Sequence, residues 1–109
     1  MTTGWKKKYH ELYLQIKSEL DSHVIEWVTN KEEIILASPL NYPSLKHKFS
    51  RVRRYKSGKL RILYVLSTEF PECWEENPQE PEILFLYVDL RKDETYSEAL
   101  KMLRKHRIL

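Results

Sequence analysis

Positively charged side chains gather in one short segment of this chain. Between residues 44 and 61 the sequence holds no carboxylate. The basic residues of that segment are Lys46, Lys48, Arg51, Arg53, Arg54, Lys56, Lys59 and Arg61. Residues 62 to 90 hold neither Lys nor Arg, and positive charge returns at Arg91 and Lys92, shortly before Tyr96. A small domain with this much charge on one pair of strands is expected to face an anion, and we favour an RNA backbone.

The same residues also have a plain structural interpretation. The basic segment could be a solvated strand face without a partner, although eight cations with no carboxylate among them favour a nucleic-acid binder. Arg91 could bond a neighbouring carboxylate, Asp89 or Glu94, while the ring of Tyr96 packs under the last helix. Taken alone, those residues fit that structural pair better than they fit a site.

Length and composition indicate one globular domain over residues 1–109. Of these residues 41% are hydrophobic and only two are glycine, which leaves no Gly-rich phosphate loop. The single cysteine, Cys73, excludes an internal disulfide and suits a reducing cytoplasm, where we expect the protein to lie. The histidines and Cys73 show no metal-ligand spacing, so we expect no metal and no small-molecule cofactor. No apolar run reaches membrane-spanning length, so we expect no membrane contact.

The first third of the chain has the apolar spacing of helices. One stripe runs at i, i+3, i+4, i+7 and i+11. Its members are Tyr9, Leu12, Tyr13, Ile16 and Leu20. Asp21 or Ser22 can cap a second helix, which Pro39 ends. The β-branched run over 23–28 leaves a strand open as an alternative for that part.

Strands dominate the rest of the chain. A basic strand ends at a tight turn on Gly58, and apolar strands follow over 60–66 and 83–88. Between these two, residues 67–82 form an acidic surface loop with three prolines. This loop is expected to be solvated, with the alternative that it folds over the face formed by the basic segment 44–61. A closing helix is predicted over 95–104.

This order of elements predicts an α+β fold. An N-terminal helical hairpin and a C-terminal helix would pack on one face of a small antiparallel β-sheet. Two motifs within it, LRILY at 60–64 and RKDETY at 91–96, resemble the RelE/ParE superfamily of bacterial and archaeal toxins in their order and spacing. The acidic loop at 67–82 is an insertion relative to compact members. The strand that usually precedes the hairpin is not evident, because residues 2–8 make a poor strand.

The resemblance implies the toxin of a type II toxin–antitoxin pair, in its ribonuclease branch. Such a toxin is expected to cut mRNA in the ribosomal A site without a metal, by attack of a ribose 2′-hydroxyl on the adjacent phosphate. It also implies a cognate antitoxin, with a partly disordered segment that folds on the toxin. A non-cleaving binding module of the same fold, directed at gyrase or degenerate and non-toxic, is the alternative.

This reaction suggests roles for five residues. Arg61 and Arg91 can stabilise the phosphorane, because a guanidinium offers a rigid donor fork that matches a phosphate. Arg51 and Arg53 stand two apart on the predicted strand, so we expect them to share a face and join the set. Tyr96 can orient the substrate or accept the 2′-hydroxyl proton.

The other cations of the motifs are expected to bind the RNA backbone. They are Lys46, Lys48, Arg54, Lys56 and Lys92. Proton transfer has no assigned residue, because arginine stays protonated in proteins. The candidates are Lys46, His47, Lys48, Tyr96 and His106. An imidazole has a suitable intrinsic pKa, but nothing in the sequence places His47. Such a chain could bind RNA well and cut it poorly.

Overall fold

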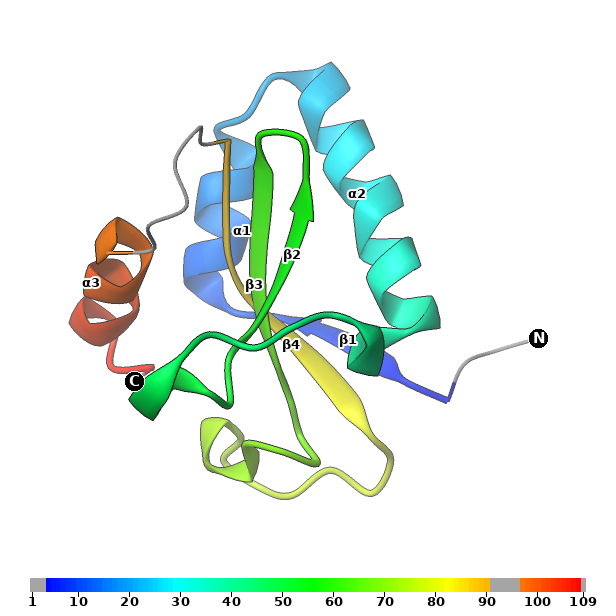
Figure 1. Ribbon diagram of the computed structural model, residues 1–109. Coiled ribbons are helices and arrows are strands. Elements are labelled where there is room, and N and C mark those ends of the chain that lie inside the picture. Colours follow the sequence, from blue (N-terminus) through cyan, green and yellow to red (C-terminus); the bar gives the residue numbers. More distant parts are fainter. Residues whose placement is uncertain (1–3, 91–96, 109) are drawn as a thin grey trace.

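A four-stranded sheet lies at the centre of the molecule, in the order β1-β4-β3-β2 (Figure 1). The structure is a computed structural model that describes residues 4–90 and 97–108. Its strands are β1 (Lys6–Tyr9), β2 (Arg53–Ser57), β3 (Leu60–Leu66) and β4 (Glu82–Leu90). Its α-helices are α1 (Glu11–Ser18), α2 (Ser22–Ala37) and α3 (Ser97–Lys105). β2, β3 and β4 pair antiparallel, whereas β1 pairs with β4 in parallel. The expected α+β fold class is confirmed.

The N-terminal helices form where the apolar spacing predicts them. α1 begins after His10, whose Nδ1 accepts a hydrogen bond from the Leu12 N–H at 3.1 Å and caps the helix. α2 begins after Asp21, which occupies the N-cap position without a side-chain cap hydrogen bond. It ends before Pro39, because the residue preceding a proline avoids the helical region. The alternative of a strand over residues 23–28 is wrong, since that segment lies inside α2.

The first strand is the element that sequence reasoning missed. β1 begins with three exposed lysines, so the apolar alternation that identifies a strand is absent. Its backbone nevertheless pairs with β4, from Lys6 opposite Glu82 to Tyr9 opposite Phe85. Tyr9 therefore ends β1 instead of opening the helical stripe. Its ring stacks on those of Tyr13 and Phe85, with centroids 5.6 and 5.5 Å away.

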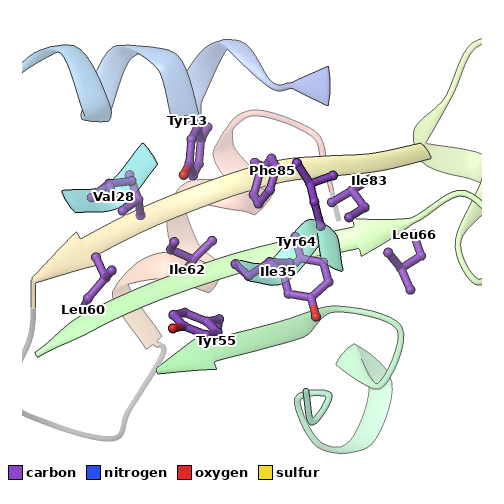
Figure 2. Packing of buried hydrophobic residues seen from close by; sticks show 12 residues of the cluster. Tyr13, Val28, Ile35, Tyr55, Leu60, Ile62, Tyr64, Leu66, Ile83 and Phe85 are labelled. Carbon is purple, nitrogen blue, oxygen red and sulfur yellow. The ribbon is translucent and has the colours of Figure 1, made fainter. Parts of the chain in front are cut away.

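Helices cover both faces of the sheet. Side chains alternate along a strand, and alternate residues of β3 belong to two separate hydrophobic clusters. The first cluster packs β3 against Val28 and Ile35 of α2 (Figure 2). The second packs Leu63 of β3 with Ala99 and Leu103 of α3. The expectation that all helices lie on one face is therefore wrong, because α2 and α3 lie on opposite faces.

A bulge decides which β4 side chains face α3. The pairing of β3 with β4 shifts register between Leu63 and Tyr64. The extra residue allows Leu86 and Tyr87, although adjacent, to join the same cluster on the α3 side. Asp89, two residues further along β4, consequently points to the α3 face as well.

A buried carboxylate joins β1, α1 and α2. Glu32 of α2 is 0% exposed. It accepts hydrogen bonds from the hydroxyls of Tyr9 at 2.8 Å and Tyr13 at 2.7 Å, and from Lys17 Nζ at 2.9 Å. Burial, with the adjacent carboxylate, raises the pKa of Tyr13 far above its ordinary value. A buried charge is tolerated only with such partners, so these bonds fix the helical hairpin against β1.

Candidate nucleic-acid interface

The hairpin register brings three predicted site residues to one side of the sheet. Lys56 of β2 lies opposite Arg61 of β3, and Arg54 lies opposite Leu63. Leu63 packs in the cluster that contains α3, so all three cations belong to the α3 side. We call Arg54, Lys56 and Arg61 the basic face. Arg54 and Lys56 were expected to bind the RNA backbone and Arg61 to be catalytic, and the fold places them together.

Arg61 is fixed inside the hairpin rather than offered to solvent. Its residue is 5% exposed. Its Nη1 donates hydrogen bonds to the carbonyls of Gly58 at 2.5 Å and Leu60 at 3.0 Å. Gly58 has a φ of +59°, the left-handed conformation that the tight turn requires. The guanidinium therefore stabilises the turn that it follows, and Arg61 lies opposite Lys56 in the β2–β3 ladder.

A carboxylate approaches the basic face from β4. Asp89 lies opposite Arg61 in the β3–β4 ladder. The Tyr87 hydroxyl donates to Asp89 Oδ2 at 3.2 Å, and the Leu90 N–H donates to Oδ1 at 2.7 Å. These bonds orient the carboxylate, and the bulge in β4 is what brings it to this face. Sequence reasoning considered Asp89 only as a partner for Arg91.

Arg53 lies on the other side of β2. Its neighbour across the ladder is Tyr64, which packs in the α2 cluster. Arg53 donates from Nε and Nη2 to the two carboxylate oxygens of Glu69, at 2.9 and 2.6 Å. It also donates from Nη1 to the carbonyls of Leu40 at 3.2 Å and Tyr42 at 2.6 Å. Its guanidinium thus joins the loop after α2 to the start of the acidic loop.

Arg51 precedes β2, so the expectation that Arg51 and Arg53 share a strand face is wrong. Its Nη1 donates to both carboxylate oxygens of Glu72, at 3.0 and 2.9 Å. Its guanidinium carbon lies 3.8 Å from the centre of the Phe70 ring. These hydrogen bonds lower the pKa of the Glu72 carboxyl, as those of Arg53 lower the pKa of Glu69.

The acidic loop therefore covers part of the basic segment. The alternative prediction, that the loop folds over the basic segment, holds for these two arginines, because the guanidinium of each forms an ion pair with a carboxylate of the loop. The same loop holds Cys73, whose thiol pKa is raised to about 11 by burial. A thiol with so high a pKa is a poor nucleophile.

A groove opens beside the basic face, between the segment before β2 and α3. Its volume is about 520 Å³. Its lining residues are Ser44, Leu45, Lys46, His47, Phe49, Arg54 and Leu100. His47 adopts a φ of +59°, which is uncommon for a residue other than glycine. Lys48 Nζ and the Arg104 guanidinium lie 5.3 and 5.1 Å from the centre of the Phe49 ring.

The remaining predicted residues divide into two groups. Lys46, Lys48 and Lys56 are exposed, as RNA-binding residues should be. Arg91, Lys92 and Tyr96 were also predicted, and they lie outside the described residues. Sequence reasoning missed the groove residues Phe49 and Leu100 as a possible ligand surface. Their signal was weak, because an aromatic and a leucine with apolar spacing are typical of a core.

Neither a metal cluster nor a membrane-spanning helix is present among the described residues. Over residues 4–90 and 97–108, no group of three or more His, Cys, Asp or Glu side chains could hold a metal ion. Within those ranges, every helix is too short or too polar to cross a membrane. His106, another candidate for proton transfer, lies with its ring 6.4 Å from that of His10.

Comparison with known proteins identifies the fold. The chain matches the RelBE2 toxin–antitoxin complex from Mycobacterium tuberculosis with a TM-score of 0.66 and 16% identity, over 85% of this chain and 98% of that one. It matches the isolated RelE toxin of E. coli with a TM-score of 0.57 and 21% identity, over 90% and 97% of the two chains. No family model and no curated protein matches. The RelE-like architecture expected from the motifs is thus confirmed, and at these identities the likeness concerns the fold.

Proposed function

We propose that the chain is the toxin of a type II toxin–antitoxin pair, and that it cleaves mRNA on the ribosome without a metal. The observation that carries this proposal is the basic face on a RelE fold. Arg54 and Lys56 lie beside Arg61 on one side of the β2–β3 hairpin, and the exposed Lys46 and Lys48 lie in the segment that precedes β2. Such a concentration of cations suits a polyanion.

The reaction itself needs charge stabilisation and one proton acceptor. The ribose 2′ oxygen bonds to the adjacent phosphorus, the bond from phosphorus to the 5′ oxygen breaks, and a 2′,3′-cyclic phosphate and a 5′-hydroxyl result. Arg54 and Lys56 would stabilise the extra negative charge, and the neighbouring charge of Arg61 would add to the positive potential. Arg91 and Tyr96 keep the roles expected from the motif.

His47 is the proton-transfer residue in this proposal. Among the candidates, it lines the groove together with Arg54 and Lys46. Its imidazole would accept the 2′-hydroxyl proton as the new bond forms, while the departing 5′ oxygen takes a proton from water. An imidazole suits this task near neutral pH, whereas a guanidinium does not.

Arg51 and Arg53 have a different task in this proposal. Each forms an ion pair with a carboxylate of the acidic loop, and Arg53 also donates hydrogen bonds to two backbone carbonyls. A catalytic role for either requires that its ion pair open when RNA binds. We therefore assign them to the stability of the loop rather than to the phosphate.

A cognate antitoxin is the partner that this function requires. The complex of M. tuberculosis is named as a toxin with its antitoxin, which supports such a partner for a chain of the same fold. An acidic segment of the antitoxin would neutralise the basic face, since opposite potentials favour association. Ribosome-dependent cleavage would take place in the cytoplasm.

A non-cleaving binding module of the same fold is the second candidate. The burial of Arg61 favours it, and so do the ion pairs of Arg51 and Arg53, because they commit these guanidinium groups to contacts within the protein. Gyrase or another target would then replace mRNA.

The experiment that separates the two uses purified protein with ribosomes programmed by a defined mRNA, in the presence of EDTA. Cleavage that leaves a 2′,3′-cyclic phosphate, and that disappears when ribosomes are omitted, would support the ribonuclease. Intact mRNA at a large excess of the protein over ribosomes would favour the binding module.

A further inference from the structure

The groove beside the basic face has the composition of a site for a single nucleotide. Its described lining holds two fixed cations, one imidazole and three apolar side chains, and no carboxylate. Its volume of about 520 Å³ lies in the range of roughly 300–1,000 Å³ that small-molecule sites occupy. Charge and size together favour an anion with an apolar part.

The cations lie where a phosphate would be held. Lys46, in the segment before β2, and Arg54, within β2, both line the groove. Glu69 and Glu72 of the acidic loop are bound to Arg53 and Arg51, and no carboxylate among residues 4–90 and 97–108 forms an ion pair with Lys46 or Arg54. The groove cations therefore keep their charge for a ligand, and an arginine can bind a phosphate with two parallel hydrogen bonds.

An aromatic ring and a leucine supply a surface for a base. Phe49 is partly buried, and so is Leu100 of α3, which lines the groove beside it. The cationic groups of Lys48 and Arg104 lie close to the Phe49 ring, so the environment of the ring is positively charged. Proteins that bind single-stranded nucleic acid combine stacking on an aromatic ring with a positively charged groove.

We propose that this groove binds one nucleotide of a single-stranded RNA, with its phosphate on Lys46 and Arg54 and its base against Phe49 and Leu100. This inference rests on the proposed function, in which the RNA is mRNA. It adds a nucleotide site that would give the cleavage a preference for certain bases. The phosphate contacts position the RNA, whereas the apolar wall distinguishes bases by how well they stack.

The test is a titration of the isolated protein with adenosine 5′-monophosphate, followed by NMR shifts of backbone and imidazole signals. Adenosine alone and inorganic phosphate alone serve as the two part-ligands. We expect shifts confined to the groove residues and saturating with the monophosphate, and at least tenfold weaker binding of either part-ligand. Arg54→Gln, an exchange at a partly exposed position, should lower the affinity for the monophosphate at least tenfold, and so should Phe49→Ala.

The control is Lys8→Gln, which removes an exposed charge from β1 at the far edge of the sheet. It should bind the monophosphate as the unchanged chain does. Shifts that are absent from the groove, or that persist unchanged in Arg54→Gln, would overturn the inference. The titration contains no ribosome, so it can succeed even if the protein does not cleave mRNA. Conversely, the protein can cleave mRNA even if the groove does not bind the monophosphate.

Discussion

Lys56 and Arg61 lie directly opposite each other across the β2–β3 ladder, so two positive charges share one site on the α3 side of the sheet. Residues paired in this way have Cβ atoms roughly 4.5–5.5 Å apart, and like charges at that distance destabilise the pair. Asp89, opposite Arg61 on β4, offsets part of this repulsion. The phosphates of a bound RNA would be attracted to the same two positive charges.

The first prediction concerns the salt dependence of RNA binding. Arg54→Ala with Lys56→Ala should weaken binding of a single-stranded oligonucleotide, because two phosphate contacts are lost. The slope of log affinity against log salt should fall by about 0.7 for each contact. Fluorescence anisotropy at several salt concentrations measures this slope. Lys7→Ala with Lys8→Ala removes the same charge from β1 and should leave the slope unchanged; equal slopes in both double variants would contradict the interface.

The second prediction concerns the acidic loop. Glu69→Gln with Glu72→Gln should strengthen RNA binding, because the positive charges of Arg51 and Arg53 would no longer be neutralised by their carboxylates. Glu75→Gln with Glu76→Gln, at exposed positions of the same loop, changes the net charge equally and is the matched control. Similar gains in affinity for both pairs would mean that net charge alone, and not the release of arginines, is responsible.

The third prediction is a pH dependence of stability. The hydrogen bonds from Arg53 lower the pKa of Glu69 below its ordinary value of 4.5. Their stabilisation is therefore fully present above pH 4.5 and is lost as pH falls through the folded-state pKa. Thermal unfolding between pH 3 and 7 should show a loss below about pH 4.5 that is smaller in Glu69→Gln. Identical pH profiles for the two proteins would contradict the role of this ion pair.

The fourth prediction concerns the buried carboxylate of α2. Glu32→Ala removes the acceptor of Lys17 and of two tyrosine hydroxyls, so the free energy of unfolding should fall by about 3–5 kcal/mol. Urea unfolding measures this change. Glu33→Ala, one residue further along and exposed, should change it by about 0.5 kcal/mol or less. A small effect of Glu32→Ala would show that the network does not hold the hairpin on β1.

The fifth prediction concerns the proton. His47→Asn keeps a side chain that tolerates the positive φ but cannot transfer a proton. Single-turnover cleavage should slow by roughly 100- to 10,000-fold, with RNA affinity almost unchanged. His106→Asn, at an exposed position beside His10, is the control and should cut normally. A full cleavage rate in His47→Asn would exclude His47 as the base.

The sequence predicts the apolar elements well because their patterns are local. The helical hairpin and the two apolar strands follow from spacing and from Pro39 and Gly58. β1 could not be predicted, since its lysines carry no apolar alternation and its pairing with β4 joins residues far apart in the chain. Parallel pairing of this kind is decided by tertiary contacts, which no local pattern reveals.

The candidate site was predicted in composition but not in arrangement. Alternate residues share a face only within a strand, so the assignment of a residue to a face requires that the start of the strand be known. β2 begins at Arg53, so Arg51 lies outside it and Arg54, not Arg53, faces the α3 side. The bulge that turns Asp89 toward Arg61 is equally invisible, because one extra residue reverses the alternation.

The measurement that tests the central claim most directly is induced expression in a bacterial host, with primer extension across several abundant mRNAs. The unchanged chain should arrest growth and produce discrete cuts within translated codons, and these cuts should vanish when translation is blocked. Arg54→Ala with Lys56→Ala should lose the cuts, whereas Lys7→Ala with Lys8→Ala should keep them. Growth arrest with intact mRNA, or unchanged cuts after loss of Arg54 and Lys56, would contradict a ribosome-dependent ribonuclease that acts through the basic face.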